Sequence, residues 1–238
     1  MTAVTPVTPV TALLVFAKEP VAGRAKTRLS PPLTPAGAAR LAAAMLDDTL
    51  AAVAAVPAVR PVLVIDGDPG DFLPAGFGVI AQRGRGQAER LAAAFEEFQD
   101  LENSGGPALL IGMDTPQVTP ALLAASARAL EAPGVDAVLG PAADGGWWAL
   151  GLRRPHPRAL AGVPMSTPDT CRHQRRRLAS LGLCCAELPA LRDVDTIGDA
   201  VAVARGVPGS AFGSALAALL PSGPRGALAG TATGGMAR

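Results

Sequence analysis

The sequence predicts an α/β fold in which helices cover both faces of a mostly parallel, mixed central sheet. Short apolar runs alternate along the chain with longer helical segments, which is typical of parallel strands buried on both faces. About half of the residues are apolar (49%), which is enough for one sizeable core. The runs that predict the main strands are residues 12–17, 61–66, 108–112 and 136–140. Residues 147–152 predict a further strand, and residues 184–188 a weaker one.

Helix starts are predicted by a repeated Thr-Pro pair. A threonine hydroxyl can accept the first free N–H groups of a helix, and proline fits the next position because its missing N–H would be unpaired there. Thr34-Pro35 opens a predicted helix to about residue 56, and the pair recurs at Thr119-Pro120 and Thr167-Pro168. Another helix is predicted at about residues 86–99.

The predicted organisation is a single domain with loose ends. Residues 1–11 are expected to form a loose leader, and residues 12–205 the folded domain. Residues 206–238 are rich in Gly, Ala and Pro, which predicts a partly disordered tail with at most one short helix, at about residues 210–220.

Charge and cysteine usage exclude several classes of function. The net charge of +1 argues against nucleic acid as a partner, and the apolar runs are too short for a membrane span. The three cysteines contain no Cys-x-x-Cys pair, which favours a reducing, cytoplasmic compartment. A small-molecule substrate is therefore expected, while the sequence leaves the oligomeric state open.

The loop after the first strand carries the strongest chemical signal. The only two lysines, Lys18 and Lys26, lie here beside Arg24 and Arg28. Ligands of open α/β sheets lie beyond the carboxyl ends of the strands, so these cations are placed to bind phosphate oxygens, while Gly23 allows close approach of the backbone. The segment GRAKT is not a P-loop, since the glycines that this motif requires are absent.

Acidic residues follow other predicted strands. Asp114 lies in IGMDTP, Asp144 in GPAADGGWW, and Asp193 and Asp195 in RDVDTIGDA. If Asp195 folds back towards Asp114, the two carboxylates can hold Mg²⁺ or Mn²⁺, which prefer oxygen ligands and share them with phosphates. The alternative is that Asp195 or Thr196 only caps the helix that follows.

Five segments together resemble a bacterial, CofC-like family of the GT-A nucleotide-diphospho-sugar transferase superfamily, some members of which are described as arsenosugar-associated glycosyltransferases. In order, the segments are LLVFAKEPVAGRAKTRL, QRGRGQAERL, IGMDTP, GPAADGGWWALGL and LRDVDTIGDA. The resemblance covers residues 12–203. The sequence departs from the family pattern at Met165, where tryptophan is usual. It also departs at Gly86-Gln87-Ala88, where a hydrophobic residue and a glycine usually precede Glu89.

The resemblance implies a Rossmann-like GT-A domain and a set of site residues. It implies that nucleotide is bound by Ala17, Lys18, Gly23, Arg24, Lys26, Arg28, Gln82 and Gly86. It implies a metal held by Asp114 and Asp195, and a pocket for sugar or acceptor at Asp144, Gly145, Gly146 and Trp147. The catalytic residues that it implies are Lys26, Arg28, Asp114 and Asp144.

Three functions are consistent with these residues. The first is a metal-dependent transferase that acts on a nucleotide-diphospho-sugar. The second is a nucleotidyltransferase that moves a nucleoside monophosphate from a triphosphate to a phosphorylated small molecule; a cationic loop suits an extended triphosphate, so the residues alone favour it slightly. The third is a non-catalytic nucleotide-binding protein, although such a protein is expected to lose its site charges first.

Overall fold

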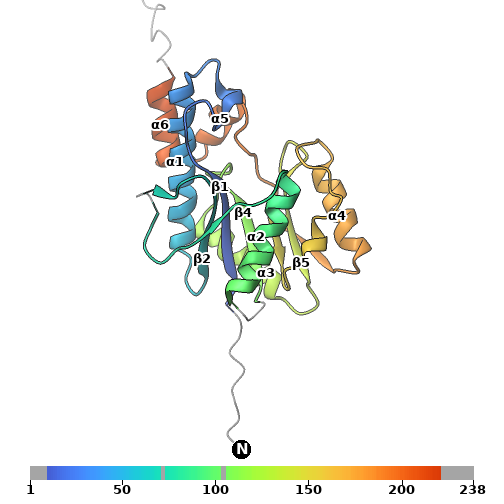
Figure 1. Cartoon of the computed structure of the whole chain (residues 1–238). Coiled ribbons are helices and arrows are strands. Elements are labelled where there is room, and N and C mark those ends of the chain that lie inside the picture. Colours follow the sequence, from blue (N-terminus) through green and yellow to red (C-terminus); the bar gives the residue numbers. More distant parts are fainter. Residues whose placement is uncertain (1–9, 71–72, 103–105, 221–238) are drawn as a thin grey trace, which may run out of the picture.

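A seven-stranded mixed sheet forms the centre of the protein, with the strand order β3-β2-β1-β4-β6-β5-β7 (Figure 1). The structure is a computed structural model that describes residues 10–70, 73–102 and 106–220. The strands are β1 (Ala12–Lys18), β2 (Arg60–Asp66), β3 (Gly78–Ala81), β4 (Ala108–Gly112), β5 (Ala137–Pro141), β6 (Trp147–Leu152) and β7 (Cys185–Glu187).

The strand directions confirm the predicted α/β class and its mostly parallel, mixed sheet. β1 runs parallel to β2 and β4, β2 to β3, and β5 to β7. β6 is antiparallel to both of its neighbours, β4 and β5. The chain leaves β1 towards β2 and later returns to its other side as β4, so the carboxyl ends of β1 and β4 flank the position where an open α/β sheet forms a ligand crevice.

Helices pack on both faces of the sheet because both faces are apolar. Along β1, Leu13 and Val15 point into one buried cluster, and Ala12 and Leu14 into the other. The first cluster is covered by α1 (Pro35–Ala54), α3 (Pro120–Glu131), α5 (Ile197–Ala204) and α6 (Ala211–Leu219), and the second by α2 (Gln87–Glu102), the short η3 (Pro157–Ala159) and α4 (Thr170–Ser180) (Figure 1).

Two of the three Thr-Pro helix starts are confirmed. The Thr34 hydroxyl accepts the N–H of Gly37, and the Thr119 hydroxyl accepts the N–H of Leu122. Each helix then begins at the following proline. The strand that the sequence did not predict is β3, an edge strand of only four residues in which Ile80 alone is buried.

The third predicted start, at Thr167-Pro168, is wrong, because α4 begins at Thr170. The N–H of Cys171 is donated to the carbonyl oxygen of Gly145 (2.8 Å), and the Thr170 hydroxyl is donated to the carbonyl oxygen of Pro164 (2.9 Å). The Thr167 hydroxyl still accepts the N–H of Asp169 (3.4 Å), but the contact of Cys171 with the turn between β5 and β6 also fixes where α4 begins.

The end of the described chain belongs to the core. Phe212 of α6 is fully buried, and the N–H groups of Ala211 and Phe212 are donated to the carboxylate of Asp48 on α1 (2.9 and 2.8 Å). The short helix expected in the tail is therefore present, and it covers α1. Most of the expected leader and the part of the tail expected to be disordered lie outside the described residues. Among the described residues, no helix is both long and apolar enough to cross a membrane.

Candidate functional site

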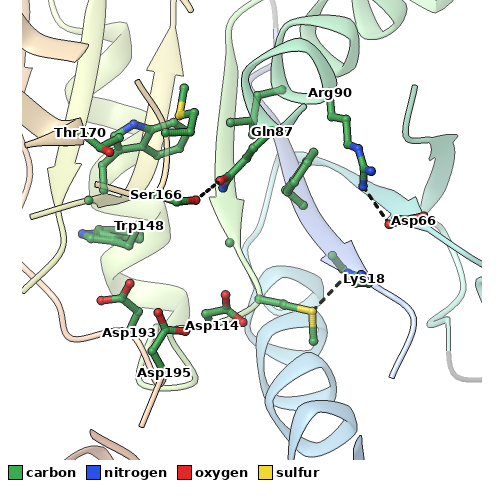
Figure 2. Close-up of a pocket in the computed structure, with 18 of the residues that line it drawn as sticks. Lys18, Asp66, Gln87, Arg90, Asp114, Trp148, Ser166, Thr170, Asp193 and Asp195 are labelled. Atoms are coloured by element: carbon green, nitrogen blue, oxygen red, sulfur yellow. Dashed lines mark hydrogen bonds and ion pairs between the residues drawn. The ribbon is translucent and has the colours of Figure 1, made fainter. Parts of the chain in front are cut away.

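A cavity of about 760 Å³ lies at the carboxyl ends of β1 and β4 and at the start of β6 (Figure 2). A volume of this size is in the range of small-molecule sites, about 300–1,000 Å³. Most of the residues predicted from the sequence line it: Ala17, Lys18, Arg24, Lys26, Arg28, Gln82, Gly86, Asp114, Asp144, Gly146, Trp147 and Asp195. Gly23 and Gly145 are not among its lining residues.

Lys26 connects the basic loop to two distant carboxylates. Its backbone is left-handed (φ 47°), and its Nζ lies 2.9 Å from Asp114 Oδ1 and 2.9 Å from Asp195 Oδ1. Its side chain is only 11% exposed. Burial by itself lowers the pKa of Lys26, but the charges and hydrogen bonds of Asp114 and Asp195 outweigh it and raise this pKa above its ordinary value. A charged amine therefore lies at the centre of the site.

The other cations of the basic loop are more exposed. Arg28 Nη1 lies 3.3 Å from Asp195 Oδ2, with 73% of the arginine side chain exposed. An ion pair in such a position contributes about 0–1 kcal/mol to stability. Lys18 and Arg24 are exposed and line the same cavity. These side chains can turn towards a ligand at little cost.

A group of three carboxylates lies beside Lys26, formed by Asp144, Asp193 and Asp195, with oxygen atoms all within 4.8 Å of one another. Burial raises the pKa of Asp193 to about 6, and the charges of Asp144, Asp195 and Asp114 act in the same direction. Crowded hard oxygens of this kind fit the ligand preferences of Mg²⁺ and Mn²⁺.

Of the three clustered carboxylates, the sequence-based prediction of the metal site did not include Asp144, which it assigned to the sugar or acceptor pocket, or Asp193. The signal for Asp193 was its spacing, because residues two apart in an extended segment point to the same side, which places Asp193 with Asp195. Asp114 and Asp195, the predicted pair of metal ligands, do come together, but Lys26 lies between them. A role for Asp114 as a ligand stays a prediction.

The segment that carries Asp193 and Asp195 is fixed by its backbone. The N–H of the fully buried Val194 is donated to the carbonyl oxygen of Asp114 (2.9 Å). Thr196 caps α5, and its N–H and hydroxyl are in turn donated to Asp199. Of the two alternatives that the sequence left open for the cap, Thr196 is the one that fills it, so Asp195 faces the site.

The turn between β5 and β6 shapes the opposite side of the cavity. Asp144 Oδ1 accepts the N–H of Gly146 (2.7 Å), which orients this carboxylate. Gly145 has φ 91°, and a Cβ on it would lie 1.9 Å from the carbonyl oxygen of Pro168. The role of Gly145 is thus close packing rather than contact with the cavity.

Gln82 holds the ends of two strands together. Its side-chain amide is donated to the carbonyl oxygens of Ala17 (2.7 Å) and Val64 (3.1 Å). Beyond it, Arg90 Nη1 lies 2.8 Å from Asp66 Oδ2 at the end of β2. These contacts shape the part of the cavity in which the resemblance places the nucleotide base.

The two tryptophans of β6 differ, as expected from strand alternation. Trp148 is buried and donates its Nε1–H to the carbonyl oxygen of Pro189 (2.9 Å). Trp147 is partly exposed in the cavity wall, and its Nε1 has no hydrogen-bond partner among the described residues. Thr115, next to Asp114, also lines the cavity, with a buried hydroxyl that lacks a partner in the described part of the chain.

Residues 42–167 match a bacterial family described as "uncharacterized protein conserved in bacteria" (DUF2064), and this match spans more than half of the chain. The protein belongs to this family. A comparison with curated proteins gives no significant match.

Solved structures share the fold. A protein of Desulfovibrio desulfuricans, provisionally assigned as a nucleotide-diphospho-sugar transferase, is 24% identical and has a TM-score of 0.79, with 87% of this chain and 94% of that chain covered. The CMP:2-keto-3-deoxy-manno-octonic acid synthetase complexed with CTP is 14% identical, with a TM-score of 0.54 and coverage of 83% and 98%. Rv0371C of Mycobacterium tuberculosis, in complex with manganese, is 21% identical, with a TM-score of 0.52 and coverage of 83% and 98%. The protein thus has the fold shared by sugar-nucleotide transferases and cytidylyltransferases.

Proposed function

We propose that the protein is a metal-dependent transferase whose donor is a nucleotide-diphospho-sugar. The observation that carries this proposal is that Lys26 meets Asp114 and Asp195 at the carboxyl ends of β1 and β4, with two further carboxylates clustered around Asp195. A cationic loop next to an acidic cluster is the arrangement expected for a diphosphate shared between side chains and a divalent ion.

The donor's phosphates are proposed to bind to the basic loop. Lys26 is buried and held in place, whereas Arg24 and Arg28 are exposed and can close on phosphate oxygens. Each charge-assisted hydrogen bond contributes about 1.5–3 kcal/mol. The nucleoside is proposed to extend towards Gln82 and Gly86, which line the same cavity.

The proposed metal ligands are the clustered Asp144, Asp193 and Asp195, joined by Asp114, which also contacts Lys26 and is a ligand predicted from the sequence. The residues fit a divalent ion because carboxylate oxygens of all three clustered aspartates already lie within 4.8 Å of one another. When bound, Mg²⁺ or Mn²⁺ supplies positive charge that neutralises the departing diphosphate. The manganese bound to Rv0371C, a protein of the same fold, supports this choice of ion.

In the proposed reaction, an acceptor hydroxyl oxygen bonds to the anomeric carbon of the donor sugar. The bond from that carbon to the diphosphate breaks, and the nucleoside diphosphate leaves with its electron pair. The hydroxyl proton passes to a carboxylate oxygen of the site that is not engaged by the cation. Lys26 and Arg28 stabilise the negative charge that develops on the leaving group.

A second candidate is nucleotidyl transfer, in which the acceptor attacks the α-phosphorus of a nucleoside triphosphate and pyrophosphate leaves. The observation that favours it is the number of cations in one short segment, since Lys18, Arg24, Lys26 and Arg28 all line the cavity. Four positive charges suit a triphosphate better than a diphosphate. The CTP bound by a synthetase of the same fold is consistent with this candidate.

A thermal-shift panel tests the proposal. Nucleoside triphosphates, nucleoside diphosphates and nucleotide-sugars are added with and without Mn²⁺, because a ligand that binds the native state raises the melting temperature. We expect the largest rise with a nucleotide-sugar plus Mn²⁺, followed by release of nucleoside diphosphate on adding acceptors. Pyrophosphate release from a triphosphate would instead establish the second candidate. Binding without turnover would indicate a non-catalytic protein, and no rise with any nucleotide would refute the proposal.

The Asp114→Asn variant tests the metal site against Asp169→Asn, an exposed aspartate that pairs with Arg172 on the surface. Asp114→Asn is expected to abolish the Mn²⁺ dependence of nucleotide binding, and Asp169→Asn to leave it intact. If Asp114→Asn still requires Mn²⁺, the ligands are confined to the three clustered carboxylates.

A further inference from the structure

The cavity has two walls of unequal charge. We call residues 16–28, 66 and 82–91 the donor wall, and residues 144–148, 165–168, 170 and 193 the acceptor wall. Figure 2 shows Lys18 and Arg90 on one side of the cavity, and Ser166, Thr170 and Asp193 across from them. All basic side chains that line the cavity belong to the donor wall: Lys18, Arg24, Lys26, Arg28, Arg85 and Arg90.

The acceptor wall contains no Lys, Arg or His among the described residues that line it. Its ionisable side chains are the carboxylates of Asp144 and Asp193. Its other lining side chains include the hydroxyl of Ser166, the ring of Trp147 and the thioether of Met165. Lys26 and Arg28 of the donor wall are held by ion pairs with Asp114 and Asp195.

The first turn of α4 does not replace the missing cations. A helix N-terminus binds anions through free N–H groups. Here the N–H of Thr170 is donated to the carbonyl oxygen of Thr167 (3.1 Å), and that of Cys171 to the carbonyl oxygen of Gly145 (2.8 Å). These donors are occupied within the protein and face no open anion site.

A divalent ion would not reverse the charge of this wall either. Asp195 is already paired with Lys26 and Arg28, and Mg²⁺ or Mn²⁺ would neutralise the two charges that Asp144 and Asp193 carry when ionised without leaving an excess positive charge. The donor's diphosphate would take up the remaining coordination of such an ion. A second phosphate, on the acceptor, would therefore meet carboxylates without a cation of its own.

We infer that the acceptor is an uncharged, hydroxyl-bearing compound such as a free sugar or polyol, and not a phosphorylated or carboxylated one. This inference rests on the proposed transferase function and deepens it. Hydroxyl groups donate to carboxylates and exchange hydrogen bonds with Ser166, and the apolar face of a sugar can pack on the ring of Trp147. The inference also excludes the phosphorylated acceptor that sequence analysis attached to nucleotidyl transfer.

The experiment begins by separating donor from acceptor. The donor is the compound that most raises the melting temperature of the full chain with Mn²⁺, among UDP-glucose, GDP-mannose, CTP, GTP and UTP. If none of these compounds raises the melting temperature, the proposed function itself fails. This result can be told apart from failure of the acceptor inference, because no acceptor has yet been added.

With that donor bound, matched acceptors are compared by the release of nucleoside diphosphate or pyrophosphate. The pairs are glucose and glucose 6-phosphate, mannose and mannose 6-phosphate, and glycerol and glycerol 3-phosphate. We expect the uncharged member of a pair to be preferred by about a hundredfold in kcat/KM, because like charges in one site cost several kcal/mol. Preference for the phosphorylated members would overturn the inference. Release by neither member would also refute it, while donor binding would still stand.

Ser166→Lys places a cation on the acceptor wall, and Ser166→Gln is its uncharged control. Ser166 is exposed and has a left-handed backbone (φ 57°), a conformation that Lys26 also adopts, and both variants remove the hydroxyl that bonds to Gln87. Ser166→Lys is expected to shift the preference at least about tenfold towards phosphorylated acceptors, and Ser166→Gln is not. An equal effect of the two variants would show that the charge of this wall does not select the acceptor.

Discussion

The two walls of the cavity recognise ligands by different physical means. The donor wall presents long, exposed cations such as Lys18, Arg24 and Arg28, whose charges can follow a flexible diphosphate. The acceptor wall is held by backbone contacts, among them the packing of Gly145 against Pro168. Charge recognition tolerates mobile side chains, whereas recognition of an uncharged molecule depends on shape and therefore on a fixed backbone.

The largest expected effect is on the acceptor wall. Gly145→Ala forces a Cβ to within 1.9 Å of the carbonyl oxygen of Pro168 at a backbone φ of 91°. We expect it to lower the free energy of unfolding by at least about 3 kcal/mol, measured by urea denaturation. The control is Gly162→Ala, where φ is 74° and nothing lies within 4 Å of the added Cβ. This control should lose only about 1 kcal/mol, from backbone strain alone. Equal losses would mean that the acceptor wall is not tightly packed.

The next effect is on the donor wall. Lys26→Ala leaves the carboxylates of Asp114 and Asp195 facing each other and removes a phosphate ligand. Nucleotide affinity is expected to fall about tenfold to a hundredfold, measured by titration calorimetry. Arg40→Ala removes an exposed cation of α1 outside the cavity and should leave the affinity unchanged. An unaltered Kd for Lys26→Ala would remove the basic loop from the site.

Removing the Asp193 carboxylate from the acceptor wall is expected to have a smaller effect on stability, and of opposite sign. Asp193→Asn removes one of three mutually repelling charges, so without metal we expect its Tm to rise by about 2–4 °C above that of the native protein. The same variant is expected to lose the stabilisation that Mn²⁺ gives to the native protein. A variant that is no more stable, or that still responds fully to Mn²⁺, would place the ion elsewhere.

The smallest effect concerns the cap that holds the carboxylate segment in place. Hydrogen bonds from Thr196 and Arg192 lower the pKa of Asp199 against the opposing effect of burial. A lowered pKa in the folded state stabilises the protein above the ordinary value of 3.8, and this stabilisation is lost as pH falls through the folded-state pKa. Asp199→Asn should therefore cost about 0.5–1 kcal/mol at pH 7, with the difference from the native protein shrinking below pH 4. A difference that is constant with pH would refute the charge-dependent cap.

Local patterns in the sequence were enough for most elements of the fold. The apolar runs placed the strands because a strand buried on both faces needs no polar alternation, and Thr34 and Thr119 placed two helix starts by capping chemistry. The pattern failed at β3, an edge strand that has little to bury. It also failed at Thr167, where contacts with the distant Gly145 decide where α4 begins.

For the candidate site, too, one part could be predicted from the sequence and another part depended on the tertiary structure. The sequence by itself determined that cations follow the first strand and that carboxylates follow later ones, because strand ends in an α/β sheet converge at one edge. The tertiary structure decided which of them meet. It placed Lys26 between Asp114 and Asp195, gathered Asp144 and Asp193 around Asp195, and separated a cationic wall from one without cations. Such pairings depend on how segments far apart in the chain pack and hydrogen-bond to one another, and spacing within one segment carries no information about that packing.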